Sequence, residues 1–402
     1  MDCVRQRAAA AARRRRFHCR RDDGGRFLKP PWAFGAAPVT WAERHYISGC
    51  LGISRGQRCE KGTPMPMRVN LPPTVFTRVS PAVLRDYAYA LLRHIDMPTD
   101  QAALLARLLV ESDLRGVHSH GTWQLARYLH EITSGGINLR PDIRVLTDSP
   151  AVTVIDGDGG MGYTPAWMAT EAAIRKALAT GLGAATTRHH GHFGAAGHYS
   201  RACAAAGCIG LAASAVRHLP AAGSCIWWAP SAPPISIAIP AGEQPPLVPD
   251  LGVYLTEVTP DNLAEKFSLM PDAFFKLLGF GAVTQILGGQ LAGVYDYPPA
   301  DRQPYPAANQ GTFVLAMNIA HFLPPAEFRL QTERFVAACR SMNPFPGAKQ
   351  AELPGGFEWQ REKDYARDGV PVSADQRKAL DQAAATAGFM PLEQWENQAP
   401  AR

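Results

Sequence analysis

The stretch that decides the fold is Ala151-Val-Thr-Val-Ile-Asp156, a short apolar segment that ends at Gly157. A longer run follows at residues 165–180, and a second apolar segment occupies Gly183 to Thr187. Short apolar runs bounded by glycine are typical of buried strands, whereas the longer run is typical of a helix. The order strand, helix, strand predicts that the middle of the chain is α/β.

The glycines between the first strand and the helix form the pattern G-x-G-x-x-G, from Gly157 to Gly162. In a Rossmann unit such glycines let the backbone approach a pyrophosphate, and an acidic residue after the second strand binds the ribose. The second strand here runs into Arg188-His-His-Gly-His192 and provides no acid, while Asp156 and Asp158 would place negative charge beside the phosphates. We therefore interpret the pattern as a structural glycine-rich turn.

Periodic patterns on both sides of this unit predict further helices and strands. Ser80 is a suitable N-cap and Pro81 suits the first position of a helix whose apolar residues recur at spacings of three and four. The other predicted elements are a helix after Thr99, a strand at Ile235–Ile239, a helix at Phe274–Leu291, a strand at Gly311–Ile319, a helix at Pro325–Arg340 and a helix at Ser373–Ala387 that opens with a Ser-x-x-Gln capping box.

Composition limits the class of protein. Of the 402 residues 46% are apolar and 19% are charged, which provides a sizeable core and excludes global disorder. Residues 1–67 hold 14 basic and 5 acidic residues, whereas the remaining chain holds 27 basic and 30 acidic residues. The net charge of +6 therefore comes from the N-terminal stretch, and we expect no nucleic-acid binding by the folded part. The longest uncharged run of small residues, Cys203 to Val216, is too short to span a bilayer, so we expect a soluble protein without membrane contact.

The N-terminal stretch differs from the rest, since Ala8 to Arg16 is an Ala/Arg low-complexity run. It is a tail, an Arg-rich transit segment, or translated upstream sequence with the true start at Met65 or Met67; its acidic residues argue against the transit segment. Order is expected from about residue 78, so that residues 1–77 are a disordered or misassigned extension. The eight cysteines form no Cys-x-x-Cys pair and no secretory segment follows the arginines, which makes the cytoplasm the expected compartment.

Histidines gather in two polar segments, His118-Ser-His-Gly121 and His189-His-Gly-His192. A metal site at His190-x-His192 is one possibility, but no third ligand stands at a suitable spacing, so no metal is expected. His118, His189, His190 and His198 taken singly are better explained as residues that cap turns or line a subunit contact. Together, however, the segments suit the reduction of a 2-oxo acid, which needs a proton donor near neutral pH and a group that binds the carboxylate.

These segments lead to a resemblance. Asp113-Leu-Arg-Gly-Val-His-Ser-His-Gly121 resembles the Asp-x-Arg-Gly-x-x-Ser-His-Gly signature of the type-2 malate/L-lactate dehydrogenase family, which includes sulfolactate and ureidoglycolate dehydrogenases, diketogulonate reductase and piperideine-2-carboxylate reductase. Further motifs follow in the order of the family over about residues 78–387. They are Tyr128, Gly135-Gly-Ile-Asn138, the glycines of 157–162, His192-Phe-Gly-Ala-Ala-Gly197 with Tyr199, Ile235 to Gly242, Lys276 with Gly279, and Leu353-Pro-Gly355.

The resemblance implies a mixed-sheet, non-Rossmann α/β fold that binds NAD or NADP, in a homodimer that acts on a small 2-oxo/2-hydroxy acid such as malate or lactate. It divides residues 78–402 into a helical part (78–148), a cofactor-binding part (about 149–335) and a C-terminal part (336–402). The implied catalytic residues are His192 as proton donor, His120 and Asp250. The implied substrate-binding residues are Ser119, Gln124, Arg127 and Tyr128, and the implied cofactor-binding residues are His120, Gly194, Lys276 and Gly279.

Several positions depart from the family pattern. Gln124 stands where the family has an arginine that binds the substrate carboxylate, and Arg127 and Arg217 are the candidates to compensate. Pro233, Tyr254 and Gln285 also replace family residues, and the segment between Asp250 and Lys276 is short. An active NAD(P)-dependent oxidoreductase is therefore the first hypothesis. The second is a catalytically silent paralogue that keeps the fold and the dimer, and a metal hydrolase is a distant third.

Overall fold

A mixed seven-stranded sheet forms the centre of the structure, a computed structural model that describes residues 71–253, 258–295 and 304–398. The strand order is β2-β3-β4-β8-β5-β6-β7, with β3 and β4 parallel and every other neighbouring pair antiparallel. This arrangement confirms the expected mixed-sheet, non-Rossmann α/β class. The strands are β2 (Arg144–Asp148), β3 (Val152–Asp156), β4 (Leu182–His190), β5 (Cys208–Val216), β6 (Pro234–Ala238), β7 (Asp250–Gly252) and β8 (Gln310–Asn318).

The predicted strand–helix–strand unit is present as β3, α4 (Tyr163–Thr180) and β4. The helix begins two residues earlier than predicted, and β4 extends three residues further, to His190. Gly183 in β4 lies so close to α4 that a β-carbon there would overlap the carbonyl oxygen of Ala173. The small side chains of this region thus allow the helix to pack directly on the sheet.

Helices cover both faces of the sheet. Ala212 of β5 belongs to the apolar cluster under α4 and α5 (Gly197–Ala205), whereas the adjacent Ala213 packs with Leu277 of α7 (Pro271–Gln285). Successive side chains of a strand point to opposite faces, so α7 lies on the face opposite α4 and α5. The single helix predicted at 274–291 is wrong in its extent: it starts at Pro271 and changes to a π-helical turn at 286–290, where Gly288 approaches the backbone of β5.

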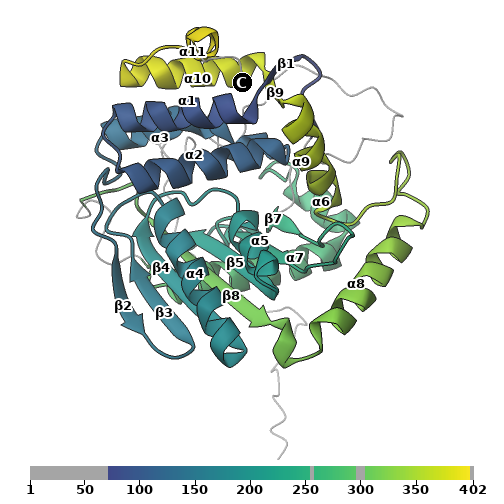
Figure 1. Ribbon diagram of the computed structural model, residues 1–402. Helices are drawn as coiled ribbons and strands as arrows, with labels where there is room; N and C mark the ends of the chain where they lie inside the picture. Colours follow the sequence, from purple (N-terminus) through teal and green to yellow (C-terminus); the bar gives the residue numbers. More distant parts are fainter. Residues whose placement is uncertain (1–70, 254–257, 296–303, 399–402) are drawn as a thin grey trace, which may run out of the picture. The chain divides into compact units, whose positions relative to one another are not determined.

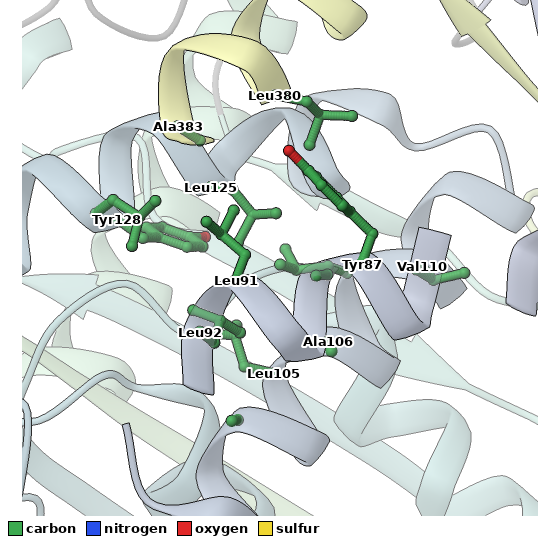
Figure 2. Close-up of a cluster of buried hydrophobic side chains, with 14 of the residues drawn as sticks. Tyr87, Leu91, Leu92, Leu105, Ala106, Val110, Leu125, Tyr128, Leu380 and Ala383 are labelled. Carbon is green, nitrogen blue, oxygen red and sulfur yellow. The ribbon is translucent and has the colours of Figure 1, made fainter. Parts of the chain in front are cut away.

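A second layer consists of helices, with its own apolar core (Figures 1 and 2). It contains α1 (Pro81–His94), α2 (Thr99–Leu114), α3 (Leu125–Thr133) and α10 (Ala374–Ala387), beside the two-stranded sheet of β1 (Phe76–Val79) and β9 (Val370–Ser373). The core side chains come from all four helices and include Tyr87, Leu91, Leu105, Leu125, Tyr128 and Leu380 (Figure 2). This layer carries one half of the site described below.

The helices begin and end close to the predicted residues, but the predicted capping hydrogen bonds form only in part. The structure confirms the start of α1 at Pro81, but Ser80 makes no side-chain cap bond. It also confirms α8 (Pro325–Arg340) as predicted. At the start of α10 the Ser373 hydroxyl accepts a hydrogen bond from the backbone N–H of Gln376 at 3.1 Å. The side chain of Gln376 donates to Asp113 instead of returning to Ser373, so only half of the expected capping box forms.

Some elements were not predicted. They are β1, β2, β5, β7, β9, α3, α5, the short α6 (Leu263–Leu269), α9 (Gly356–Asp368) and α11 (Leu392–Gln398). Order begins before residue 78, since Phe76 already pairs with Ser373. The predictions for residues 1–70 and for Tyr254 lie outside the described residues, and the division of the rest into three parts stays a prediction. Within the described ranges, no helix has both the length and the apolar character needed to cross a membrane.

Candidate active site

The two histidine segments meet in space. His120 lies in a 3-10 turn (His118–His120) after α2, and His192 lies just beyond the end of β4. The centroids of the two imidazole rings are 5.5 Å apart, with an angle of 29° between the ring planes. Two residues that are 72 positions apart in the chain thus form one polar cluster between the helical layer and the sheet.

Asp113 holds the turn that carries His120. Its carboxylate is fully buried and accepts hydrogen bonds from the backbone N–H of Thr122 (2.9 Å), the hydroxyl of Thr122 (2.7 Å) and the side-chain amide of Gln376 (3.1 Å). Gly121 must be glycine, because a β-carbon there would overlap the Asp113 carboxylate. Asp113 opens the signature of residues 113–121, and its role in the structure is to shape this turn.

His192 is anchored through one ring nitrogen. Its Nδ1 lies 2.6 Å from the hydroxyl of Tyr128, which lies 3.0 Å from the hydroxyl of Tyr163, and both tyrosines are buried. Within the described residues Nε2 has no hydrogen-bond partner. Burial, with smaller contributions from His120 and Arg127, keeps the pKa of His192 well below its ordinary value. The imidazole is therefore neutral at pH 7 and is open at Nε2.

Tyr128, predicted to bind the substrate, has its hydroxyl against the imidazole of His192, and its role toward the substrate stays a prediction. Tyr163, the first residue of α4, was missed: it follows the glycine-rich turn, and no motif in the sequence marks it. Gly194 has a φ of +82°, and a β-carbon there would lie 2.6 Å from the Tyr163 hydroxyl. Gly194, predicted to bind the cofactor, thus makes room for the tyrosine pair.

Asp250 lies at the start of β7, and its Oδ2 accepts a hydrogen bond from the Gly197 amide at 2.9 Å. Asp250 is exposed as a whole residue, but partial burial of its carboxylate raises the pKa of that group, against the opposing effects of Arg201 and His120. Burial has the opposite effect on His120 and lowers its pKa. Asp250 opposes this shift, and Arg127 adds to it. Asp250 and His120 are thus electrostatic neighbours, but they form no ion pair.

The predicted substrate-binding residues lie next to the two histidines. The Ser119 hydroxyl lies 3.0 Å from Nδ1 of His120. Gln124 donates from its amide to the Ser119 carbonyl at 2.5 Å, and its buried Oε1 has no partner. Arg127 pairs with Glu131 at 2.8 Å on the outside of α3, yet its charge still lowers the pKa values of His120 and His192. Arg127 is thus the nearby cation that acts on both histidines.

Two predicted cofactor-binding residues, Lys276 and Gly279, lie three residues apart on α7, and both are exposed. Nothing lies within 4 Å of a β-carbon at Gly279. Their proposed role stays a prediction, as does that of Arg217, whose backbone amide donates to the Asn309 carbonyl at 2.6 Å.

The other histidines have internal partners. His190 is completely buried between the Thr187 hydroxyl and the Gly191 carbonyl, both at 2.7 Å, and its pKa falls to about 4. His198 lies 2.9 Å from the Ser112 hydroxyl, and its pKa also falls to about 4 because of burial. His189 contacts Asp156 and His118 contacts Asp113. In the described part of the chain no group of three His, Cys, Asp or Glu residues is arranged to hold a metal ion.

The glycine-rich turn uses its amides internally. The N–H groups of Gly157, Gly159 and Gly162 donate to the carbonyls of Arg188, His189 and His192. In return, Gly191 donates to Gly160 at 2.8 Å. These amides are not available to a pyrophosphate, which confirms the interpretation of the motif as structural. The turn's function is to hold the backbone that carries His192.

Comparison with known proteins gives one consistent family. The malate/L-lactate dehydrogenase family model matches residues 79–254 and 256–381. A malate dehydrogenase from Pyrococcus horikoshii is 28% identical over 340 residues, which cover 76% of this chain and 94% of that protein. A ureidoglycolate dehydrogenase (NAD(+)) from Escherichia coli K12 is 25% identical over 309 residues, which cover 69% of this chain and 87% of that protein. The solved structure of malate dehydrogenase from P. horikoshii OT3 superposes with a TM-score of 0.68 and 26% identity, covering 80% of this chain and 98% of that one.

Proposed function

The chain belongs to the malate/L-lactate dehydrogenase family of oxidoreductases, and on that premise we propose that it transfers a hydride between NAD(P)(H) and a small 2-oxo/2-hydroxy acid. The observation that carries this proposal is the state of His192. Its Nδ1 is fixed by the buried Tyr128–Tyr163 pair, while Nε2 has no partner among the described residues. An imidazole that is anchored at one nitrogen and open at the other is suited to general acid–base catalysis.

In this proposal His192 moves the proton. During oxidation of a 2-hydroxy acid, the neutral imidazole accepts the hydroxyl proton at Nε2 while Nδ1–H donates to the Tyr128 oxygen. During reduction, the imidazolium returns that proton to the oxygen of the former carbonyl. The depressed pKa of His192 favours the base form in the free protein, and a bound substrate carboxylate would raise this pKa again, because an anion stabilises the imidazolium.

The substrate carboxylate would lie near Arg127, Gln124 and Ser119. Arg127 already affects the pKa values of both histidines, which supports its assignment as the cation nearest to the reacting group. Gln124 supplies only neutral hydrogen bonds, which are roughly half as strong as charge-assisted ones. We therefore expect weaker binding of simple 2-oxo acids than an arginine at residue 124 would give.

The residues beside the histidines fit a nicotinamide cofactor. The Asp250 carboxylate uses Oδ2 for the Gly197 amide, so its other oxygen can accept from a carboxamide. The exposed Lys276 ammonium is free to meet a phosphate, and His120 and Gly279 would line the same site. When bound, the nicotinamide supplies or takes the hydride. The name of the E. coli relative supports NAD, and no residue described here selects against NADP.

We further propose a cytoplasmic homodimer. Large apolar side chains at Phe275 and Val283 of α7, and at Ile286 of the π-helical turn that follows it, are exposed in the single chain, as expected of a surface that a second copy covers. The main alternative is a catalytically silent paralogue, which the replacement of an arginine by Gln124 favours. Gln285 does not add to that case, because it is buried and bonds to Ser231 and to the Val216 carbonyl, a structural role.

The test is oxidation of NADH and NADPH by the full-length protein across a panel of 2-oxo acids and cyclic imino acids. We expect turnover with at least one 2-oxo acid. A nucleotide fluorescence titration on the same sample separates the other outcomes. Binding without turnover would support the silent paralogue, whereas no binding of either nucleotide would overturn the dehydrogenase proposal.

A further inference from the structure

A cavity of about 760 Å³ lies at the other end of α5 from Asp250. Its walls come from the C-terminal half of α5, the turn after β6, the start of α8, and α9 (Figure 1). Most of the lining is apolar, including Ala241, Ile319, Phe328 and Trp359. None of the residues assigned above to the substrate or the cofactor lines this cavity.

Two arginines interrupt the apolar lining. Arg201 of α5 is half-buried, and partial burial lowers the pKa of its guanidinium. It forms no hydrogen bond and no ion pair with any described residue, although Asp250, Glu358 and Glu362 lie near enough to influence it. Its neighbour Arg115, by contrast, pairs with Glu362 at 2.8 Å.

Arg329 of α8 is the second cation. The stem of its side chain lies against Gly242, which has a φ of +58°. Like Arg201, it has no hydrogen bond or ion pair within the described part of the chain.

Arg201 is half-buried, and its donors are unused by the described residues, so it can bind an acceptor that enters the cavity. Its planar fork matches a carboxylate or phosphate group, and the apolar wall beside it suits the body of a small organic molecule. We propose that this cavity binds a small organic oxyanion, with its charged group on Arg201, additional charge from Arg329, and its apolar part against Trp359 and Phe328.

Arg201 lines the cavity and also acts electrostatically on Asp250 of the candidate active site. A β-carbon at Gly197 would meet both the Asp250 carboxylate and the Arg201 guanidinium, so the two groups lie on either side of the same position. An anion on Arg201 would therefore weaken the attraction that Arg201 exerts on Asp250. The bound oxyanion is thus an effector of the active site; this second part rests on the proposed function, whereas binding itself does not.

The test is calorimetric titration of the full-length protein with two probes, inorganic phosphate and benzoate. We expect millimolar or tighter binding of at least one probe. Preference for benzoate would identify a carboxylate with an apolar body, and preference for phosphate a phosphate ester. The Arg201→Gln variant should weaken binding at least ten-fold. Arg334→Gln, which removes an exposed charge from the same helix as Arg329 but outside the cavity, should leave it unchanged.

A second variant keeps the result independent of local damage around Arg201. Ala205→Phe fills the cavity from α5 with all charges retained, and it should also abolish binding; melting curves establish that each variant is folded. The proposal is overturned if neither probe binds the parent protein in the millimolar range, or if Arg201→Gln or Ala205→Phe binds as the parent does. If the chain turns over a 2-oxo acid, the bound probe should also change the KM for that acid, and an unchanged KM would refute the effector role while leaving the binding result intact.

Discussion

The glycine-rich turn at 157–162 and the cluster around His120 and His192 are neighbouring regions that differ in how their polar groups are used. In the turn, the amides of Gly157, Gly159 and Gly162 already donate to backbone carbonyls. In the cluster, Nε2 of His192, Oε1 of Gln124 and one oxygen of Asp250 have no partner in the described chain. The comparison teaches that a candidate site is better identified by unused hydrogen-bonding capacity than by a familiar pattern of residues.

The same contrast exists between two histidines of one segment. His190 uses both ring nitrogens and is completely buried, whereas His192 uses only Nδ1. Their positions in the sequence differ by two residues, but the His190 ring bonds to Thr187 and Gly191 at the end of the inner strand β4, whereas the His192 ring stacks on His120. The cluster around His120 and His192 is the open region, because some of its polar groups have no partner among the described residues, and the glycine-rich turn is the closed region. Four predictions test whether catalysis depends on the open region and stability on the closed region.

The largest effect is expected for His192→Ala. Loss of the proton donor and acceptor should lower kcat by about 10²–10⁴-fold, with binding of NADH nearly unchanged, because no proposed dinucleotide contact is removed. The measurement is steady-state reduction of the best 2-oxo acid, together with a nucleotide titration. Full turnover in the variant would show that His192 is not the acid; His189→Ala serves as the matched control and should retain activity.

Tyr128→Phe should have the next largest effect. It leaves Nδ1 of His192 without its 2.6 Å partner, and an unpaired buried polar group costs about 1–3 kcal/mol. If this cost falls on the transition state, kcat drops about 10- to 100-fold while KM changes little. Tyr163→Phe keeps the contact between Tyr128 and His192 and should cause a smaller loss. A higher KM with an unchanged kcat in the Tyr128→Phe variant would instead indicate that Tyr128 binds the substrate directly.

Gly162→Ala tests the closed region. A β-carbon there would overlap the Gly191 carbonyl oxygen, and overpacking of this kind costs about 1–3 kcal/mol of stability. We expect a lower Tm but unchanged NADH affinity of the folded protein, measured by calorimetry and nucleotide titration. An unchanged Tm together with a loss of NADH affinity would contradict the structural interpretation and indicate that the turn binds the nucleotide. Gly162 has a φ of −67°, a conformation that alanine adopts readily, so the loss of stability can be attributed to the overlap and not to backbone strain.

The smallest effect is expected for Gln124→Arg, which adds charge to the open region. A charged hydrogen bond to the substrate carboxylate exceeds a neutral one by about 1 kcal/mol, so the KM for simple 2-oxo acids should fall about five-fold. Gln124→Glu is the matched control and should raise KM by repulsion. A further loss of affinity in the arginine variant would mean that the pocket is shaped for another headgroup.

Part of the fold was readable because its signals are local. The apolar run before Asp156, the periodic pattern after Pro81 and the limits of α8 depend on side chains close together in the chain. The central strand β5 was missed because most of its residues are small, with alanine, glycine, serine and cysteine among them, and these residues carry a weak strand signal. Those residues are small because α5 lies close: a β-carbon at Gly210 would overlap the Cys203 side chain, a reason that only packing provides.

The sequence by itself determined the family, through the residues from Asp113 to Gly121, and it identified His120 and His192 as the residues for chemistry. It also contained the argument against a Rossmann site at 157–162, namely the missing acid. Only the tertiary structure decided that Tyr128 and Tyr163 anchor His192, that Asp113 shapes the turn of His120, and that Arg201 faces a cavity without a partner. The physical reason is that residue types and short spacings set which groups are present, whereas hydrogen bonding and burial depend on segments that meet only after folding.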